Sequence, residues 1–259
     1  MQGPRRSTKL GLFADGAVGE AVLAHIAGSC HDNLAYVVIR EGSQALAESA
    51  RRLGLRAPLL VWPVHQASLE LPRYGSQVPD VVLLAWWPDL VRLPFLQAGQ
   101  RFTLNLHPSL LPHGRGKDPN FWALVEGSPF GVTIHHVDES VDGGAIAFQR
   151  EVSIDWTDTG ATLYAKAQRA IISLVADSLD AILALDIPRI EQDTTIGSFH
   201  RRAELVLASL IDLDQHYTGR DLLNLLRART FRPHSGCRFV EDGDRYEVRV
   251  EIQRIKSDE

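Results

Sequence analysis

Short apolar runs alternate with amphipathic segments along the first half of the chain. Because these runs lack the alternation of apolar and polar residues that marks a strand with one face in water, they predict strands covered on both faces. The segments between them carry apolar residues at helical spacing. Right-handed crossovers then predict an α/β fold with a mostly parallel, doubly wound sheet. The expected strands are KLGLFA (9–14), LAYVVIR (34–40), PLLVWP (58–63) and VVLLAWW (81–87), and the expected helices are 18–28 and 43–54.

The same pattern continues to about the middle of the chain. The sequence favours a strand at TLNLH and a short helix at NFWALVEG, and then two strands, GVTIHHV and AIAFQREVSI, joined by a turn at DESVDGG. A long helix is expected over 159–185, because the preceding TDTG offers Asp and Thr as N-caps.

The character of the sequence changes after this helix. The segment 213–231 predicts an amphipathic helix, and GCRFVEDGDRYEVRVEI predicts a hairpin that turns at 241–244. A tail this short makes a weak core by itself, so we expect it to pack on the main domain or on a second subunit. The expected division is a main domain over 1–195 and a short C-terminal module over 196–259.

Composition and charge exclude several classes of partner. The 259 residues are 45% hydrophobic and 23% charged, as in a soluble globular protein. A net charge of −5 with a pI near 6.1 disfavours nucleic acid as the main partner. No run approaches the roughly 18 apolar residues of a membrane span. Cys30 and Cys237 are far apart and lack a CxxC spacing, which fits a reducing compartment, so we expect a cytoplasmic protein.

Polar side chains gather where the strand TLNLH ends. Asn105 and His107 are two residues apart, so their side chains lie on one face of the strand. Open α/β sheets bind their ligands at this carboxyl end. Pro108 disfavours the helical region for His107 and holds it extended. The following Gly-Arg-Gly turn at 114–116 would bring backbone close to a bound molecule, and its arginine adds a charge and a forked donor.

Each of these residues also has a plain structural interpretation. An Asn-x-His sequence at a strand end is usually polar capping, and Asp142 lies in VDGGA, where Asp-Gly is a leading turn signal. His135 and His136 are neighbours in one strand and point to opposite faces, so at most one of them can face a crevice. No single residue therefore identifies a site.

Their joint arrangement is more specific. The stretch NLHPSLLPHGRGKDPNFWALVEGSPFGVTIHHVDESVDGGAIA resembles the N10-formyltetrahydrofolate-dependent formyltransferases. That family includes glycinamide ribonucleotide formyltransferase, methionyl-tRNA formyltransferase and the sugar N-formyltransferases. The positions that match the family pattern are Asn105, His107, Pro108, Ser109, Leu111, Pro112, Arg115, Gly116, Trp122, Ala123, Gly131, Val132, Thr133, His135, Asp142 and Gly144. The resemblance implies a Rossmann-like core with a mixed, mostly parallel sheet, plus a small C-terminal helix and β-hairpin module.

The resemblance also implies an enzyme that moves a formyl group from N10-formyltetrahydrofolate to an amine. Asn105 and His107 would donate hydrogen bonds to the developing oxyanion, each worth roughly 3–4 kcal/mol. Asp142 would take the proton of the attacking amine, and a share in this role stays open for His107. This chemistry requires no metal.

The cofactor contacts implied by the resemblance lie in LLAWWPDLVRLP, in LLPHGRG and in the turn before Asp142. In related enzymes these segments form the pterin pocket, largely through backbone groups. An ordinary place at the end of a buried strand is an equally good interpretation of Trp86. The cofactor-binding candidates are Trp86, Trp87, Leu111, Pro112, Arg115 and Gly116.

The tail separates the branches of this family. A methionyl-tRNA enzyme would carry a further domain of about 100 residues with basic surface for phosphates, whereas only the module 196–259 follows here. Glycinamide ribonucleotide enzymes have a Gly-Ser-Gly-Thr-Asn-like loop after their first strand, and FADGAVGEAV lacks it. The tail instead resembles the enzymes that formylate nucleotide-linked 4-amino-4,6-dideoxyhexoses, whose hairpin often supports dimerisation. We therefore expect a homodimer that serves surface-polysaccharide (O-antigen or lipopolysaccharide) biosynthesis.

Residues that would hold the acceptor or its diphosphate follow from the same resemblance. The candidates are Lys117, Asn120, Tyr217 and Arg220, although solvation at the surface explains Lys117 and Arg220 equally well. The pair His113-Gly114 departs from the Tyr/Trp-Asn common among the sugar enzymes. The alternatives are the tRNA or ribonucleotide transferases, a hydrolase that releases formate from the same cofactor, and a binding module without catalysis.

Overall fold

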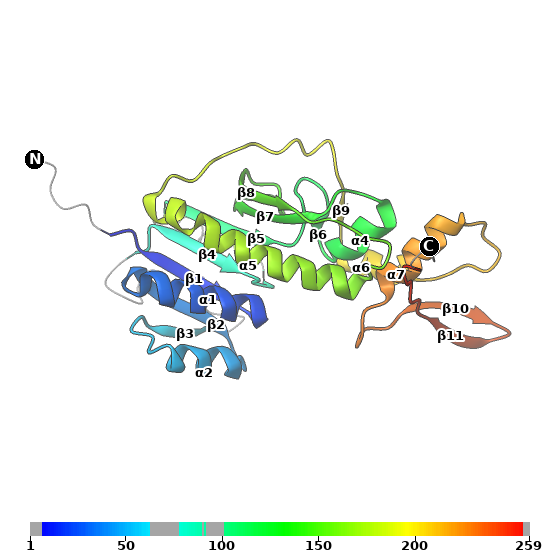
Figure 1. The fold of residues 1–259 in the computed structure, drawn as a ribbon, viewed down its shortest axis with the longest axis horizontal. Coiled ribbons are helices and arrows are strands. Elements are labelled where there is room, and N and C mark those ends of the chain that lie inside the picture. The colour runs from blue at the N-terminus through cyan, green and yellow to red at the C-terminus, as the bar shows by residue number, and fades with distance from the viewer. Residues whose placement is uncertain (1–6, 63–77, 90, 92–100, 256–259) are drawn as a thin grey trace, which may run out of the picture. The chain divides into compact units, whose positions relative to one another are not determined.

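The computed structural model of the chain describes residues 7–62, 78–89, 91 and 101–255 (Figure 1). The chain forms two compact units, each assembled from separate segments. Unit 1 comprises Met1–His107, Thr133–Gln149 and Ile171–Gln192, and unit 2 comprises Pro108–Val132, Arg150–Ala170 and Asp193–Glu259. The expected boundary after residue 195 stays a prediction.

A seven-stranded sheet with the order β3-β2-β1-β4-β5-β7-β8 is the main feature of unit 1. The pairs β1–β2, β1–β4, β2–β3 and β4–β5 are parallel, whereas β5 and β7 are antiparallel. The expected mixed, mostly parallel sheet is therefore confirmed. The strand order reverses between β1 and β4, which is the point where such sheets bind ligands. The strands are β1 (Leu10–Ala14), β2 (Leu34–Arg40), β3 (Leu59–Trp62), β4 (Val81–Ala85), β5 (Phe102–His107), β7 (Gly131–His136) and β8 (Ile146–Glu151).

Burial explains why the sequence shows continuous apolar runs. Every residue of β1 and of β4 is buried, as expected for central parallel strands covered on both sides. Phe13 from β1 packs edge to face against Trp62 at 5.6 Å and against Trp87 at 5.1 Å between ring centroids. Aromatic pairs at such angles and distances add to the stability that burial alone provides.

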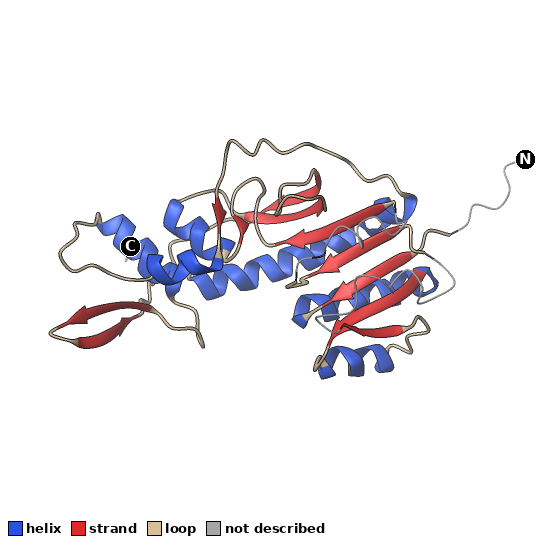
Figure 2. Cartoon of the chain, turned by 180° about the vertical axis from the view of Figure 1, so that it is seen from behind, coloured by secondary structure: helices blue, strands red, loops and turns tan. Residues whose placement is uncertain are grey.

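The first helices follow the predicted spacing closely. Helix α1 (Gly16–Cys30) buries Val18, Val22 and Ile26, four residues apart along one face. A short 3-10 turn, η1 (His31–Asn33), leads into β2, and α2 (Gln44–Arg52) follows that strand. Figure 2 shows the strands from the side opposite to Figure 1, with α1 behind them. None of the helices in the described residues is long and apolar enough to cross a bilayer.

Helix α5 (Gly160–Ala184) contributes residues to both units and matches the predicted long helix. Unit 2 also contains α4 (Pro119–Glu126), which packs against α7 (Gly219–Arg229). Helix α7 is shorter than the amphipathic segment expected over 213–231. The reason is its cap: the Thr218 side chain accepts a hydrogen bond from the Asp221 backbone N–H and starts the helix there.

Three short elements of unit 2 were not expected from the sequence. Strands β6 (Arg115–Gly116) and β9 (Phe199–His200) pair with each other in parallel. Helix α6 (Arg202–Ala208) follows β9 directly. A strand of two residues is too short to show a period in the sequence. Its pairing partner is also distant in sequence, so only the folded chain defines the pair.

The C-terminal hairpin is confirmed. Strands β10 (Cys237–Glu241) and β11 (Asp244–Val248) are antiparallel and place Glu241 opposite Asp244. The two turn residues, Asp242 and Gly243, have φ values of 49° and 85°. Positive φ at both positions is the type I′ turn that Asp-Gly favours, because its twist matches that of the strands.

Candidate active site

The paired strands β5 and β7 place three polar side chains on one face of the sheet. Asn105 and His107 share that face because they are two residues apart in β5. The antiparallel register sets Asn105 directly opposite His135, and residues opposite each other in such a pair point to the same side. All of these residues, and the loop that carries Asp142, belong to unit 1.

A hydrogen bond joins the first two of these residues and defines their orientation. Asn105 Nδ2 lies 3.1 Å from His135 Nε2, and His135 Nδ1 lies 2.9 Å from the backbone oxygen of His136. A carbonyl oxygen can only accept, so Nδ1 carries the proton, and the unprotonated Nε2 accepts from the Asn105 amide. The amide nitrogen of Asn105 is therefore held on the side of His135. No acceptor for its second N–H lies among the described residues.

Asp142 completes the cluster from the loop between β7 and β8. Its Oδ1 lies 3.6 Å from His107 Nδ1 and 3.6 Å from His135 Nε2. These distances place the carboxylate beside both rings but exceed those of good hydrogen bonds. The side chains of His107 and Asp142 are only 6% and 15% exposed. Low exposure strengthens any interaction of these groups with a charge that develops nearby.

The backbone around Asp142 leaves little freedom. Asp142 has a φ of 53°, in the left-handed region, and its carbonyl oxygen accepts a hydrogen bond of 3.0 Å from Gln192 Nε2. A Cβ atom on Gly144 would lie 1.9 Å from the backbone oxygen of His136. Glycine is therefore required at 144, because no other residue lets the loop return this close to β7.

The neighbouring histidine points the other way. His136 Nε2 donates a hydrogen bond of 2.8 Å to the backbone oxygen of Pro188. Burial lowers the pKa of His136 below its ordinary value of 6.5, and the bond to Pro188 opposes this shift only in part. The prediction that no more than one of these two histidines faces the cluster is confirmed.

The Gly-Arg-Gly loop is stabilised within unit 2 by its own backbone. Through the β6–β9 pair, Arg115 N donates to Ser198 O, and Arg115 Nη2 donates to Thr194 O at 3.2 Å. Gly116 has a φ of 89°, and a Cβ there would lie 2.2 Å from His200 O. The close approach that requires this glycine is therefore made by the chain itself.

The polar cluster and the fold can now be compared with known proteins. Residues 64–179 match the family model for formyl transferase, and residues 204–254 match the model for the N-formyltransferase dimerization C-terminal domain. Together the two matched segments span more than half of the chain. The chain belongs to the formyltransferase family. The first match includes the whole cluster of Asn105, His107, His135 and Asp142, and the expected enzyme class is confirmed.

Solved structures agree with this family. The formyltransferase is 23% identical to a 4-N formyltransferase from Francisella tularensis, with a TM-score of 0.81 over 96% of this chain and 99% of that chain. It is 16% identical to an N-formyltransferase from Helicobacter canadensis, with a TM-score of 0.71 over 91% and 85% of the two chains. It is 26% identical to glycinamide ribonucleotide transformylase 1 from Symbiobacterium toebii, with a TM-score of 0.60 over 71% and 95%. These likenesses confirm the expected Rossmann-like fold.

Among the candidates for folate binding, the two tryptophans of the formyltransferase differ in environment. Trp87 is 8% exposed and belongs to the core cluster of Phe13, Tyr36 and their neighbours. This packing accounts for the ring, whereas its buried Nε1 has no hydrogen-bond partner among the described residues. Trp86 is half-buried and has a φ of 60°, a conformation that large residues rarely adopt and that is frequent at functional sites. A role in cofactor binding stays a prediction for both.

The other candidates for folate binding lie in the loop of unit 2. Leu111 is 2% exposed and Pro112 is half-buried, and Arg115 and Gly116 form β6. Cofactor binding by these four residues stays a prediction.

The four candidates for acceptor binding also lie in unit 2 and have different environments. Asn120 is 8% exposed, and its Nδ2 donates to Gly160 O at 3.0 Å, so this contact explains its side chain without a ligand. Tyr217 Oη accepts from the Asp212 backbone N–H at 3.2 Å. Lys117 is exposed, and Arg220 is exposed at the edge of a cavity described below. Acceptor binding by these residues stays a prediction.

Sequence reasoning missed the contribution of His135. Its place in the Gly-Val-Thr-x-His segment was noted, but the contact with Asn105 depends on the β5–β7 register, which no local pattern defines.

Proposed function

We propose that this formyltransferase moves the formyl group of N10-formyltetrahydrofolate to the amine of a nucleotide-linked 4-amino-4,6-dideoxyhexose. The observation that carries the proposal is the convergence of the Asn105 amide, the His107 imidazole and the Asp142 carboxylate in one buried cluster. An amide and an imidazole provide hydrogen-bond donors, and a carboxylate accepts a proton. Formyl transfer from nitrogen to nitrogen needs these functions.

The sugar acceptor is supported by the related proteins. The Helicobacter canadensis N-formyltransferase was crystallised with folinic acid and dTDP-3-aminofucose, and the Francisella tularensis protein is a 4-N formyltransferase. Both cover more than nine tenths of this chain, whereas the glycinamide ribonucleotide enzyme covers 71%. The wider coverage by these two N-formyltransferases supports the sugar branch.

When bound, N10-formyltetrahydrofolate supplies a formyl carbon that is already activated by its nitrogen. Asn105 and His107 hold N–H donors toward the oxygen that gains negative charge when the amine adds to this carbon. Donors held in place before the reaction cost no reorganisation, and each lowers the barrier by roughly 3–4 kcal/mol. The hydrogen bond to His135 contributes by fixing which side of the Asn105 amide carries the N–H groups.

Asp142 has the role of proton acceptor. Its carboxylate lies 3.6 Å from His107 Nδ1 and 3.6 Å from His135 Nε2, beside the groups that would bind the formyl oxygen. With the folate bound, Asp142 would accept the proton that the amine loses and would return it to the leaving nitrogen, directly or through water. General acid–base catalysis of this kind contributes roughly 10²–10⁴-fold to a rate.

The C-terminal module supports an assembly of two copies. Residues 204–254 match a dimerization domain, and several large apolar side chains of this module are exposed, including Leu207 at 72% and Val240 at 60%. We infer a homodimer on this basis. Cys30 and Cys237 are both free thiols, which is consistent with a cytoplasmic enzyme. Neither nucleic acid nor membrane is a partner in this proposal, and surface-polysaccharide (O-antigen or lipopolysaccharide) biosynthesis is the proposed context.

A panel of acceptors tests the proposal. The purified chain is incubated with N10-formyltetrahydrofolate and, separately, with nucleotide-linked 4-amino sugars, 3-amino sugars, glycinamide ribonucleotide, Met-tRNA and water alone. We expect formylation of a nucleotide-linked 4-amino sugar, detected by mass spectrometry as a formylated product. Equal turnover on all acceptors, or release of formate without an acceptor, would contradict the sugar assignment.

A further inference from the structure

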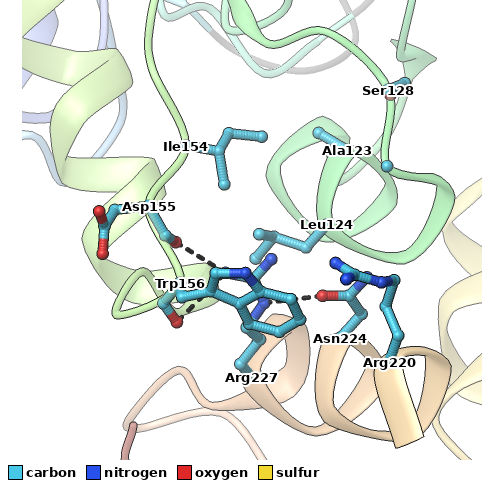
Figure 3. Close-up of a pocket in the computed structure, with 10 residues that line it drawn as sticks. Ala123, Leu124, Ser128, Ile154, Asp155, Trp156, Arg220, Asn224 and Arg227 are labelled. Atoms are coloured by element: carbon cyan, nitrogen blue, oxygen red, sulfur yellow. Dashed lines mark hydrogen bonds between the residues drawn. The ribbon is translucent and has the colours of Figure 1, made fainter. Parts of the chain in front are cut away.

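A cavity of about 260 Å³ lies within unit 2, between α4, the segment Ile154–Trp156 and α7 (Figure 3). Its walls include Trp156, Arg220, Asn224 and Arg227. None of these residues takes part in the polar cluster of unit 1, and of these four only Arg220 is a candidate for acceptor binding.

Arg227 forms a rigid cationic wall of the cavity. It is 6% exposed, and its Nη1 donates to the backbone oxygens of Asp155 at 2.7 Å and of Trp156 at 3.3 Å. Its Nε donates to Asn224 Oδ1 at 3.0 Å. These bonds, drawn in Figure 3, use neutral acceptors. The carboxylates of Asp158 and Asp155 act on the charge of Arg227 without forming an ion pair with it among the described residues.

Two further donors line the same cavity. Arg220 is exposed, and no carboxylate of the described residues lies within ion-pair distance of it. Asn224 is 8% exposed, and because its Oδ1 is bound to Arg227, its amide nitrogen is the atom left to interact. That nitrogen has no acceptor in the part of the chain that the structure describes. It is therefore available to donate to a bound acceptor.

Trp156 adds a partly exposed aromatic surface that both arginines contact. Its side chain is 40% exposed, and the Cζ atoms of Arg227 and Arg220 lie 4.6 Å and 5.0 Å from its ring. Exposed indoles beside guanidinium groups provide stacking surface for planar rings.

The cavity also contains one carboxylate, that of Asp155, which opposes the binding of an anion. Hydrogen bonds from Thr157 are the largest cause that lowers the pKa of Asp155, so it remains charged at neutral pH. Arg254 forms an ion pair with its Oδ2 and offsets this charge. The two lining arginines therefore leave a net positive cavity.

We propose that this cavity binds a nucleoside phosphate, with the base against Trp156 and the phosphate on Arg220 and Asn224. Donors without acceptors favour an anion, and the indole favours a planar ring on the same ligand. The volume is just below the roughly 300–1,000 Å³ of typical small-molecule sites, so the cavity holds the base and phosphate end of a ligand while the remainder lies outside. Such a site goes beyond the proposed formyl transfer, because it involves none of the reacting groups.

Binding is measured by calorimetry on the full chain without N10-formyltetrahydrofolate, so that the result does not depend on catalysis. The probes are dTDP, UDP, GDP and inorganic pyrophosphate. We expect a nucleoside diphosphate to bind more tightly than pyrophosphate, and Arg220→Gln and Trp156→Ala each to weaken it about ten-fold. Arg51→Gln, a change at an exposed arginine on α2 in unit 1, is the matched control and should bind as the unchanged protein does.

The source of the nucleotide is distinguished by a competition arm. A nucleotide-linked amino sugar that displaces the diphosphate from the unchanged protein, but loses affinity in Arg220→Gln, identifies the acceptor as the ligand. A sugar nucleotide that fails to displace it identifies a free nucleotide. Asn105→Ala should bind the nucleotide as the unchanged protein does, even if it no longer transfers formyl. Loss of formyl transfer and loss of nucleotide binding can therefore be told apart. Absence of nucleotide binding, or equal binding by Arg220→Gln and Trp156→Ala, would overturn the proposal.

Discussion

Asn105 Nδ2 and His135 Nε2 lie 3.1 Å apart, although the two residues are 30 positions apart in the sequence. The contact depends on the antiparallel pairing of β5 with β7. The pairs β1–β2, β1–β4, β2–β3 and β4–β5 of the same sheet are parallel. It fixes the Asn105 amide with its nitrogen toward His135. An otherwise freely rotating amide thereby becomes a directed donor.

The first prediction concerns this orientation. We expect His135→Ala to lower kcat about ten-fold with little change in KM, because the Asn105 amide loses the acceptor that aligns it. Steady-state kinetics with N10-formyltetrahydrofolate and the sugar nucleotide measure the effect. His136→Ala is the matched control, since the adjacent imidazole lies on the other face and bonds to Pro188. A comparable loss of kcat in both variants would indicate damage to the strand and not to the amide.

The second prediction concerns the three reacting side chains. Asn105→Ala, His107→Ala and Asp142→Asn should each lower kcat by about 10²–10³-fold, because each removes an interaction that is strongest in the transition state. Binding of the folate, measured by calorimetry, should change little, since these groups act on charge that only develops during the reaction. Wild-type activity in His107→Ala would remove the oxyanion role from that residue.

The third prediction concerns the loop that holds Asp142. Gly144→Ala should lower the free energy of unfolding by roughly 1–3 kcal/mol and also lower kcat, because the new Cβ meets a backbone oxygen that cannot move aside. At Gly143 a Cβ would meet the Ser140 hydroxyl at 2.4 Å, and a side chain can rotate away. Gly143→Ala should therefore be milder in both urea unfolding and activity. The reverse order of severity would show that the loop is not packed against β7 as described.

The fourth prediction concerns pH. Burial lowers the pKa of His136 in the folded protein, so below its ordinary value of about 6.5 the unfolded chain binds a proton that the folded chain does not. The free energy of unfolding should therefore fall as the pH decreases below about 6.5. His136→Gln should reduce this slope, measured by urea unfolding between about pH 5 and 7.5. An identical slope in both proteins would show that His136 does not titrate differently on folding.

The strands and the main helices follow from local patterns, because period and turn chemistry act over a few residues. The buried runs of β1 and β4, the apolar face of α1 and the Asp-Gly turn of the hairpin are examples. The beginning of α7 at Thr218 was less accessible to prediction. The amphipathic spacing of the sequence begins before Thr218. The helix itself begins only after Thr218, because the side chain of that residue caps it.

The amino-acid sequence by itself determined that Asn105 and His107 share one face at a strand end, because side chains alternate along any strand. It also identified Asp142 through the resemblance to formyltransferases. Only the tertiary structure decided that His135 lies opposite Asn105 and that Gln192 holds the Asp142 loop. Only the tertiary structure brings together the residues that line the cavity, which include Trp156, Arg220, Asn224 and Arg227. These contacts join segments far apart in the chain, and their formation depends on strand register and helix packing, which no local pattern encodes.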